Sequence, residues 1–190
     1  MQIQGYFDVR FETVRDEFEQ LFTRKNPQRG GALCVKVGGE TVLDLWAGQR
    51  DATENAVWET DTLVNVFSCT KAFTSVAMLQ LVEEGKIALD DPVANVWPEF
   101  AAAGKEWITL RELLCHRAGL PAISQPLPES ALYNWSELTQ ALANQQPWWE
   151  PGTEQGYAAI TFGWLLGELI QRLDNLPAGE AIMRRTAQVA

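Results

Sequence analysis

The 190-residue sequence contains little of what metal sites are built from: one histidine and three cysteines. Cys34, Cys69 and Cys115 lie far apart and form no C-x-x-C pair, whereas structural zinc sites need four grouped Cys and His ligands. We therefore expect no metal and no other cofactor. The cysteines occur in apolar stretches, which predicts buried free thiols and a reducing compartment.

Basic residues are scarce as well, with 15 Lys and Arg against 25 Asp and Glu and a formal net charge of −10. Such a charge repels nucleic acids and anionic membrane surfaces. No apolar stretch is long enough to cross a bilayer, and residues Met1 to Gly5 lack the basic and apolar regions of a signal peptide. The sequence therefore predicts a cytoplasmic protein without nucleic-acid or membrane partners.

The first part of the chain predicts a helix and a hairpin. Apolar residues at helical spacing indicate an amphipathic helix over about Asp8 to Arg24. Two β-rich runs, 32–37 and 41–46, surround Gly38-Gly39 and are typical of a β-hairpin. Both runs are mostly apolar, so we expect their strands near the middle of a covered sheet.

The rest of the chain is mostly helical in pattern. Helices are expected over about Ser68–Glu84, Thr109–Cys115 and Ser136–Asn144 and after Ile160, with Thr109 as an N-cap and Gly85 as a C-cap. Hydrophobic residues make up 46% of the chain, enough for one domain with a substantial core. Strands followed by a helical run indicate an α/β or α+β fold.

The strongest chemical signal is Ser68-Cys69-Thr70-Lys71, at the start of a predicted helix. Residues i and i+3 share one helical face, so the Lys71 amine can approach the Ser68 hydroxyl. A serine hydroxyl is a weak nucleophile until a base removes its proton, and a lysine can act as that base only when neutral. The positive end of the helix disfavours a further charge there, and its free N–H groups can stabilise an oxyanion.

Four segments together resemble the β-lactamase-like serine hydrolases: class C β-lactamases, family VIII carboxylesterases and penicillin-binding proteins. The resemblance covers most of Gly30 to Leu173. It implies a β-lactamase/transpeptidase-like fold, in which an antiparallel sheet is flanked by helices and accompanied by a helical region. The S-x-x-K tetrad is one of the motifs of these enzymes. The segments that carry the resemblance are Val66–Phe73 around the tetrad, Glu83–Val93, Leu110–Leu120 and Pro151–Tyr157.

The resemblance implies a role for three residues. Ser68 would form the acyl-enzyme, Lys71 would lower the proton affinity of Ser68, and Tyr157 would relay protons between Ser68 and the leaving group. A core tyrosine is the alternative reading of Tyr157. His116 matches a helix-end histidine of the family and is interpreted as structural, and no G-x-S-x-G segment supports an α/β-hydrolase triad.

Two departures from the family pattern bear on activity. The family's Y-x-N becomes Tyr157-Ala158-Ala159, which removes an amide that would hold a substrate carbonyl and favours small esters over β-lactams. No third motif, a Lys, His or Trp followed by T/S-G or G-G, occurs after Tyr157, and full relatives are roughly twice as long. We therefore expect residues 1–175 to be the N-terminal and helical part of one truncated domain, and 176–190 to be a tail outside the pattern, either frayed or foreign to the fold.

Three hypotheses stay open at this point. The first is a serine hydrolase that forms an acyl-enzyme on Ser68 and acts on small-molecule esters or amides, with small carboxylic esters as the favoured substrates. The second is a truncated, catalytically inactive fragment whose open sheet edges favour homo-oligomers. The third is a β-lactamase or D,D-peptidase, which would need export.

Overall fold

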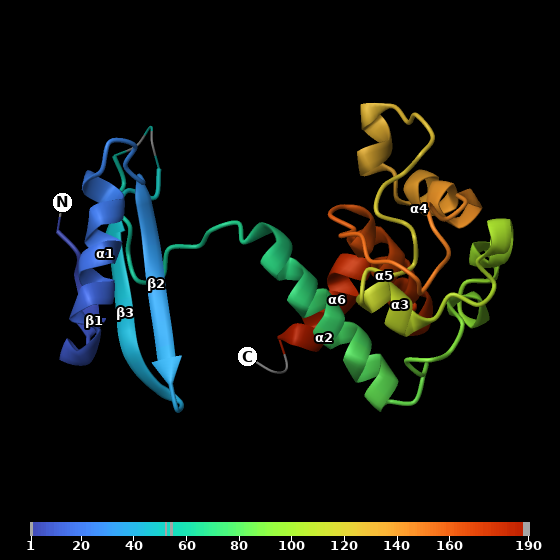
Figure 1. Ribbon diagram of the computed structural model, residues 1–190, viewed down its shortest axis with the longest axis horizontal. Helices are drawn as coiled ribbons and strands as arrows, with labels where there is room; N and C mark the ends of the chain where they lie inside the picture. The colour runs from blue at the N-terminus through green and yellow to red at the C-terminus, as the bar shows by residue number, and fades with distance from the viewer. Residues whose placement is uncertain (1, 52, 54, 188–190) are drawn as a thin grey trace. The chain divides into compact units, whose positions relative to one another are not determined.

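The computed structural model describes residues 2–51, 53 and 55–187, and the chain divides into two compact units, residues 1–65 and 66–190 (Figure 1). No helix within these described residues is long and apolar enough to cross a membrane.

The first unit is a three-stranded antiparallel sheet with one long helix. Its strands are β1 (Gln4–Phe7), β2 (Gly30–Val37) and β3 (Glu40–Gly48), in the order β1-β3-β2. The hairpin prediction is confirmed: Gly38 and Gly39 join β2 to β3 with φ of 59° and 87°, the positive values that a two-residue type I′ turn requires. The register pairs Leu33 with Leu45.

One helix covers one face of this sheet. A short 3₁₀ turn, η1 (Val9–Phe11), leads into α1 (Glu12–Thr23), so the expected helix begins later than Asp8. Phe18 and Phe22 of α1 are buried against alternate residues of β3, Leu43 and Leu45 among them. A sheet with one apolar face needs such a partner, and α1 supplies it.

Two expectations, one for the sheet of this unit and one for the cysteines of the whole chain, are wrong. β3 is the central strand, but β2 lies at an edge and alternates between half-buried and exposed residues, with Cys34 on the exposed side. All three cysteines are free, as expected, but all three are exposed rather than buried. Cys69 and Cys115 lie at helix ends, where side chains leave the apolar stripe even though the neighbouring residues are hydrophobic.

The second unit is a bundle of α- and 3₁₀-helices around one core. Buried residues of α2 and α5 recur at i, i+3, i+4 and i+7, such as Thr74, Ala77, Met78 and Leu81, which is the stripe of a helix packed on one side. The elements are η2 (Phe67–Cys69), α2 (Thr70–Glu83), η3 (Val93–Asn95), η4 (Pro98–Gly104), α3 (Leu110–Leu114), η5 (Glu129–Tyr133), α4 (Trp135–Asn144), α5 (Thr161–Asp174) and α6 (Ala178–Thr186).

Local signals position several of these helices. Thr109 caps α3 through a full capping box with Glu112, as its sequence predicts. Gly85 follows α2 with φ of 71°, which confirms the expected C-cap. Asn134 caps α4 by accepting a hydrogen bond from the Glu137 amide.

A buried lysine joins η4 to the end of α4. Lys105 is fully buried, and its Nζ donates to the backbone carbonyls of Ala102, Ala143 and Gln145 at 2.6, 2.9 and 2.5 Å. The last carbonyls of a helix lack partners within the helix and carry partial negative charge. Lys105 therefore satisfies the end of α4 with an internal cation.

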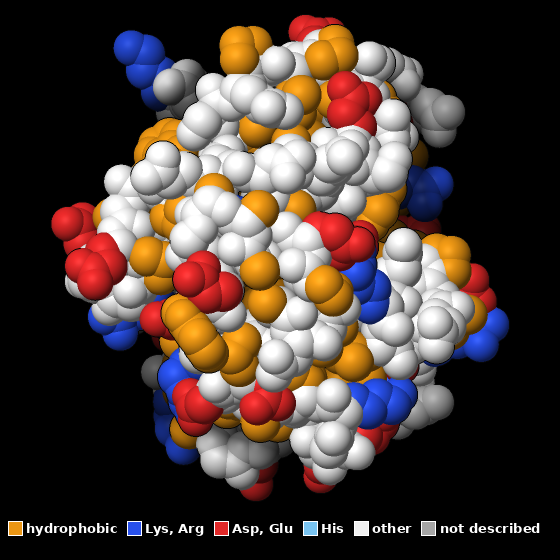
Figure 2. All heavy atoms as spheres, turned by 90° about the vertical axis from the view of Figure 1, so that its right-hand side faces the viewer, with side chains coloured by type: hydrophobic (Ala, Val, Ile, Leu, Met, Phe, Trp, Pro, Cys, Tyr) orange, Lys and Arg blue, Asp and Glu red, His pale blue; other side chains and the backbone are white. Residues whose placement is uncertain are grey.

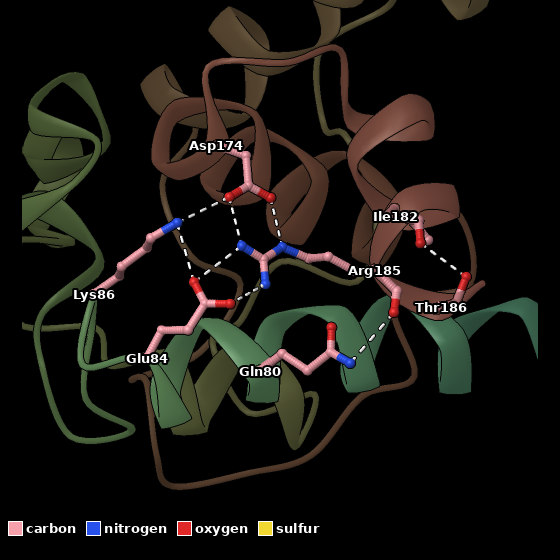
Figure 3. Close-up of polar contacts among 7 residues, drawn as sticks. All are labelled: Gln80, Glu84, Lys86, Asp174, Ile182, Arg185 and Thr186. Carbon is pink, nitrogen blue, oxygen red and sulfur yellow. Dashed lines mark hydrogen bonds and ion pairs between the residues drawn. The ribbon is translucent and has the colours of Figure 1, made fainter. Parts of the chain in front are cut away.

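The segment after Leu176, expected as a tail outside the pattern, contains a packed helix through Thr186. Ala178 and Ala181 of α6 are buried, and Arg185 donates to Asp174 at 2.5 and 2.6 Å and to Glu84 at 2.7 and 3.1 Å (Figure 3). Residues 188–190 of the expected tail lie outside the described residues.

Lys86 completes this group. Its Nζ lies 3.1 Å from a carboxylate oxygen of Glu84 and 3.1 Å from one of Asp174 (Figure 3). We call Glu84, Lys86, Asp174 and Arg185 the Arg185 cluster. It ties α6 to the ends of α2 and α5, and the Gln80 side chain adds a hydrogen bond to the Arg185 carbonyl at 3.3 Å.

Candidate active site

Ser68 lies in η2, immediately before α2. The preceding residue, Phe67, has φ of 46°, a left-handed conformation that is uncommon for a bulky side chain. Such a conformation costs on the order of 1–3 kcal/mol and persists only where the surroundings enforce it. The turn that presents Ser68 is therefore a strained one, of the kind that clusters at functional sites.

Lys71 lies one helical turn further on and contacts Ser68 as the tetrad predicts. Its Nζ is 3.1 Å from Ser68 Oγ and donates to the Ala159 carbonyl at 2.7 Å. The lysine thus bridges two segments that are 88 residues apart in the chain. The second contact, which the sequence did not indicate, holds the amine over the serine.

Tyr157 lies at the same place, so the structure brings together all three predicted site residues. Lys71 Nζ is 5.0 Å from the centroid of the Tyr157 ring. Hydrogen bonding to Ser68 and then to Lys71, with the charge of Lys71 adding to it, lowers the pKa of the Tyr157 phenol. The side chain is 55% exposed, which excludes the alternative of a core tyrosine.

His116 lies behind this group rather than in it. Its Nδ1 accepts a hydrogen bond from the Ala158 amide at 3.2 Å, and its ring centroid lies 4.9 Å from those of Tyr157 and Phe162. Burial, and then the charge of Lys71, lower its pKa from 6.5. A ring that accepts at Nδ1 is neutral and carries its proton on Nε2.

The turn after α3 binds the loop that carries Tyr157. The Gly156 amide donates to the His116 carbonyl at 3.1 Å, and the Gly152 amide donates to the Arg117 carbonyl at 3.0 Å. The Arg117 guanidinium donates in return to the Gly152 carbonyl. Two segments of the family resemblance, 110–120 and 151–157, are therefore hydrogen-bonded to each other, which sequence spacing alone does not reveal.

An apolar groove of about 460 Å³ begins at Ala159. It runs between the loop 121–132 and the start of α5, and Glu129 is the ionisable side chain on its wall. Ala159 belongs both to this groove and, through its carbonyl, to the Lys71 contact. The Pro-rich connection after Leu120 was the only sequence signal for it. Its main apolar side chains are Ile123, Leu127, Leu132, Ile160 and Trp164.

Charged side chains are dispersed over the face of the molecule that Figure 2 shows. On the face in Figure 2, acidic, basic and hydrophobic side chains alternate, and the basic ones form no continuous stripe. Among residues 2–51, 53 and 55–187, no three His, Cys, Asp or Glu side chains are grouped so as to hold a metal ion.

The fold, with a serine and a lysine in contact at the start of a helix, is that of the β-lactamase-like serine hydrolases. The sequence model of the beta-lactamase family matches residues 17–190, and the chain belongs to that family. This confirms both the predicted family and the predicted fold class, an α+β fold with a small antiparallel sheet and many helices.

The relatives include esterases and penicillin-binding-protein homologues. "Esterase/beta-lactamase LipL" of Mycobacterium tuberculosis is 34% identical over 168 residues, which are 88% of this chain and 38% of the relative. A penicillin-binding-protein homologue from Caulobacter crescentus superposes with a TM-score of 0.88 at 36% identity, over 97% of this chain and 49% of the other. A family VIII carboxylesterase gives 0.84 at 38% identity, over 96% and 50%. The chain thus spans half or less of the length of these relatives.

Proposed function

We propose that Ser68 is the nucleophile of an acyl-enzyme mechanism that hydrolyses small carboxylic esters. The observation that carries this proposal is the position of Lys71 Nζ, 3.1 Å from Ser68 Oγ and held there by the Ala159 carbonyl at 2.7 Å. The step requires Lys71 in its neutral form, in which one N–H donates to that carbonyl and the lone pair can take the Ser68 proton.

The proposed reaction has two half-reactions. Ser68 Oγ attacks the ester carbonyl while its proton passes to Lys71, and the bond to the leaving alkoxide breaks. Tyr157 delivers a proton to that alkoxide and regains one from Lys71, which returns the amine to its neutral form. The lowered pKa of the phenol, caused by hydrogen bonding to Ser68 and then Lys71, suits it to give and take a proton. Water then repeats the steps on the acyl-enzyme, which releases the acid and restores Ser68.

The walls of the site favour an apolar ester over an anionic β-lactam. Ala159 presents a methyl group where the family pattern has an amide, and the adjoining groove is lined by apolar side chains with Glu129 as its ionisable group. Burying an apolar acyl chain there is favourable, whereas a substrate carboxylate would meet a like charge. We therefore propose esters with an apolar acyl group as the substrate class.

The test is intact-mass labelling with a fluorophosphonate, which reacts with activated serines by forming an Oγ–P bond and releasing fluoride. We expect one adduct on the wild-type chain and none on Ser68→Ala. A folded wild-type chain that stays unlabelled would support the non-catalytic alternative instead.

Substrate class is tested separately. p-Nitrophenyl butyrate should be hydrolysed and nitrocefin should not. Hydrolysis of nitrocefin, lost in Ser68→Ala, would replace the esterase proposal with that of a β-lactamase.

A further inference from the structure

His116, the one histidine of the sequence, holds the Tyr157 segment at two points. Its carbonyl accepts from the Gly156 amide at 3.1 Å, and its Nδ1 accepts from the Ala158 amide at 3.2 Å. These two amides flank Tyr157 on either side. The backbone of the tyrosine is therefore clamped to a single residue 41 positions earlier in the chain.

The clamp extends to the lysine. Ala159, the next residue after the clamped amide, accepts from Lys71 Nζ at 2.7 Å, and Lys71 in turn lies 3.1 Å from Ser68 Oγ. The His116 ring also packs at 4.9 Å against the ring of Tyr157. A shift of His116 would move both groups that contact Ser68.

We propose that His116 is a positioning residue, which holds Gly156 and Ala158 and so aims Tyr157 and Lys71 at Ser68. The inference rests on the function proposed above and adds to it a residue that touches neither substrate nor Ser68. Displacing reacting groups by about 1 Å can lower a rate about 100-fold, so a clamp of this kind is functionally sensitive.

The backbone of His116 carries strain of its own. Its φ is 59°, in the left-handed region where asparagine and glycine are tolerated far better than most residues. Two replacements therefore separate the backbone from the side chain. His116→Asn keeps the conformation and offers Oδ1 as an acceptor near the place of Nδ1, whereas His116→Gly keeps the conformation and removes the acceptor.

The clamp depends on a neutral ring. Protonation at Nδ1 would remove the acceptor for the Ala158 amide and place a positive charge beside the Lys71 amine. The titratable groups that face the ring are Lys71 from α2 and Tyr157 from the clamped loop, and Cys115 and Arg117 flank it on its own turn. Labelling of Ser68 should therefore fall as the pH drops through the titration of His116.

The experiment measures the rate of fluorophosphonate labelling against pH for wild type, His116→Asn and His116→Gly. We expect His116→Gly to label about 10- to 100-fold more slowly. His116→Asn should stay within about fivefold of wild type and lose the part of the acid limb that His116 contributes, because its amide does not titrate. Equal rates for wild type and His116→Gly would overturn the inference and leave the proposed function intact, whereas an unlabelled wild-type chain would overturn both.

A second measurement covers the case in which the glycine variant does not fold. With a single histidine, ¹⁵N NMR signals of the imidazole need no assignment by mutagenesis. We expect the Nε2–H tautomer and a titration midpoint below 6.5 that coincides with the part of the acid limb that His116→Asn removes. A midpoint that differs from that part of the acid limb, or the Nδ1–H tautomer, would count against the clamp.

Discussion

Replacing Arg185 by methionine should destabilise the second unit by about 2 kcal/mol. The side chains of Arg185 and Asp174 are 13% and 10% exposed and share two hydrogen bonds of 2.5 and 2.6 Å. Hydrogen bonds to charged groups contribute about 1.5–3 kcal/mol, and removing one partner of a buried pair leaves the other unsatisfied. Lys86 remains 3.1 Å from Asp174 and keeps the loss below the 3–5 kcal/mol range of a fully orphaned charge.

The neighbouring Arg184 is a matched control. It pairs with Glu180 on the same helix, and both side chains are largely exposed. Exposed pairs of this kind contribute about 0.3–0.5 kcal/mol, so Arg184→Met should be close to wild type. The same substitution one residue apart thus compares an exposed ion pair with a partly buried one.

Urea unfolding followed by tryptophan fluorescence measures the difference. Trp97, Trp135 and Trp164 all belong to the second unit and report on its unfolding. With a slope of about 2 kcal/mol per molar urea, the midpoint of Arg185→Met should fall by about 1 M. A shift as small as that of Arg184→Met would refute the reasoning, because the Arg185 cluster would then be an ordinary surface network.

The effect should also depend on pH in one direction. The hydrogen bonds from Arg185 lower the pKa of Asp174 and lower that of Glu84 to about 2. Carboxyl groups with lowered pKa values stabilise the fold above the pKa of the unfolded chain, near 4, and lose that contribution as the pH falls through their folded values. The difference in free energy of unfolding between wild type and Arg185→Met should therefore be largest at pH 7 and shrink between about pH 4 and 2.

Four further outcomes are expected. Lys105→Met should lower the free energy of unfolding by about 3 kcal/mol, measured by thermal unfolding, because three backbone carbonyls lose a buried cationic donor. A clearly smaller loss would mean that water takes the place of the amine. Thr109→Ala should cost about 1 kcal/mol by removing the capping box of α3, measured by urea unfolding. Tyr157→Phe should slow fluorophosphonate labelling about 100- to 10,000-fold through loss of the hydroxyl, and an unchanged rate would remove Tyr157 from the proposed mechanism. If the groove at Leu132 takes the acyl chain, kcat/KM for p-nitrophenyl esters should rise about fourfold per methylene until the groove is filled, and Leu132→Asn should flatten that series.

Features set by neighbouring residues could be predicted from the sequence. The hairpin depends on Gly38-Gly39, and the start of α3 depends on Thr109 and Glu112, three positions apart. The contact between Ser68 and Lys71 follows from the pitch of one helical turn. Each of these needs only short-range geometry.

Features that depend on residues far apart in the chain could not be predicted from the sequence. Cys34 lies in an apolar run, but whether it points toward α1 depends on strand pairing, and it points away. The helix α6 is anchored by Arg185, whose acidic partners lie 11 and 101 residues away in the chain. Because ion pairs rather than an apolar stripe hold this helix, its hydrophobic periodicity was too weak to predict it. The contact between His116 and Ala158 spans 42 residues. It depends on the left-handed backbone of His116, which no local sequence pattern predicts.

The exposed thiols give the site a chemistry that its serine does not share. Cys69 directly follows Ser68 and Cys115 directly precedes His116, and both are free and open to solvent. Exposed thiols convert on oxidation to sulfenic acids or intermolecular disulfides, and they react with alkylating reagents that leave serine untouched. The redox state of a preparation therefore changes the surroundings of Ser68 and His116. A maleimide dye on Cys69 or Cys115 would place a reporter next to them once Cys34, the third exposed thiol, has been replaced.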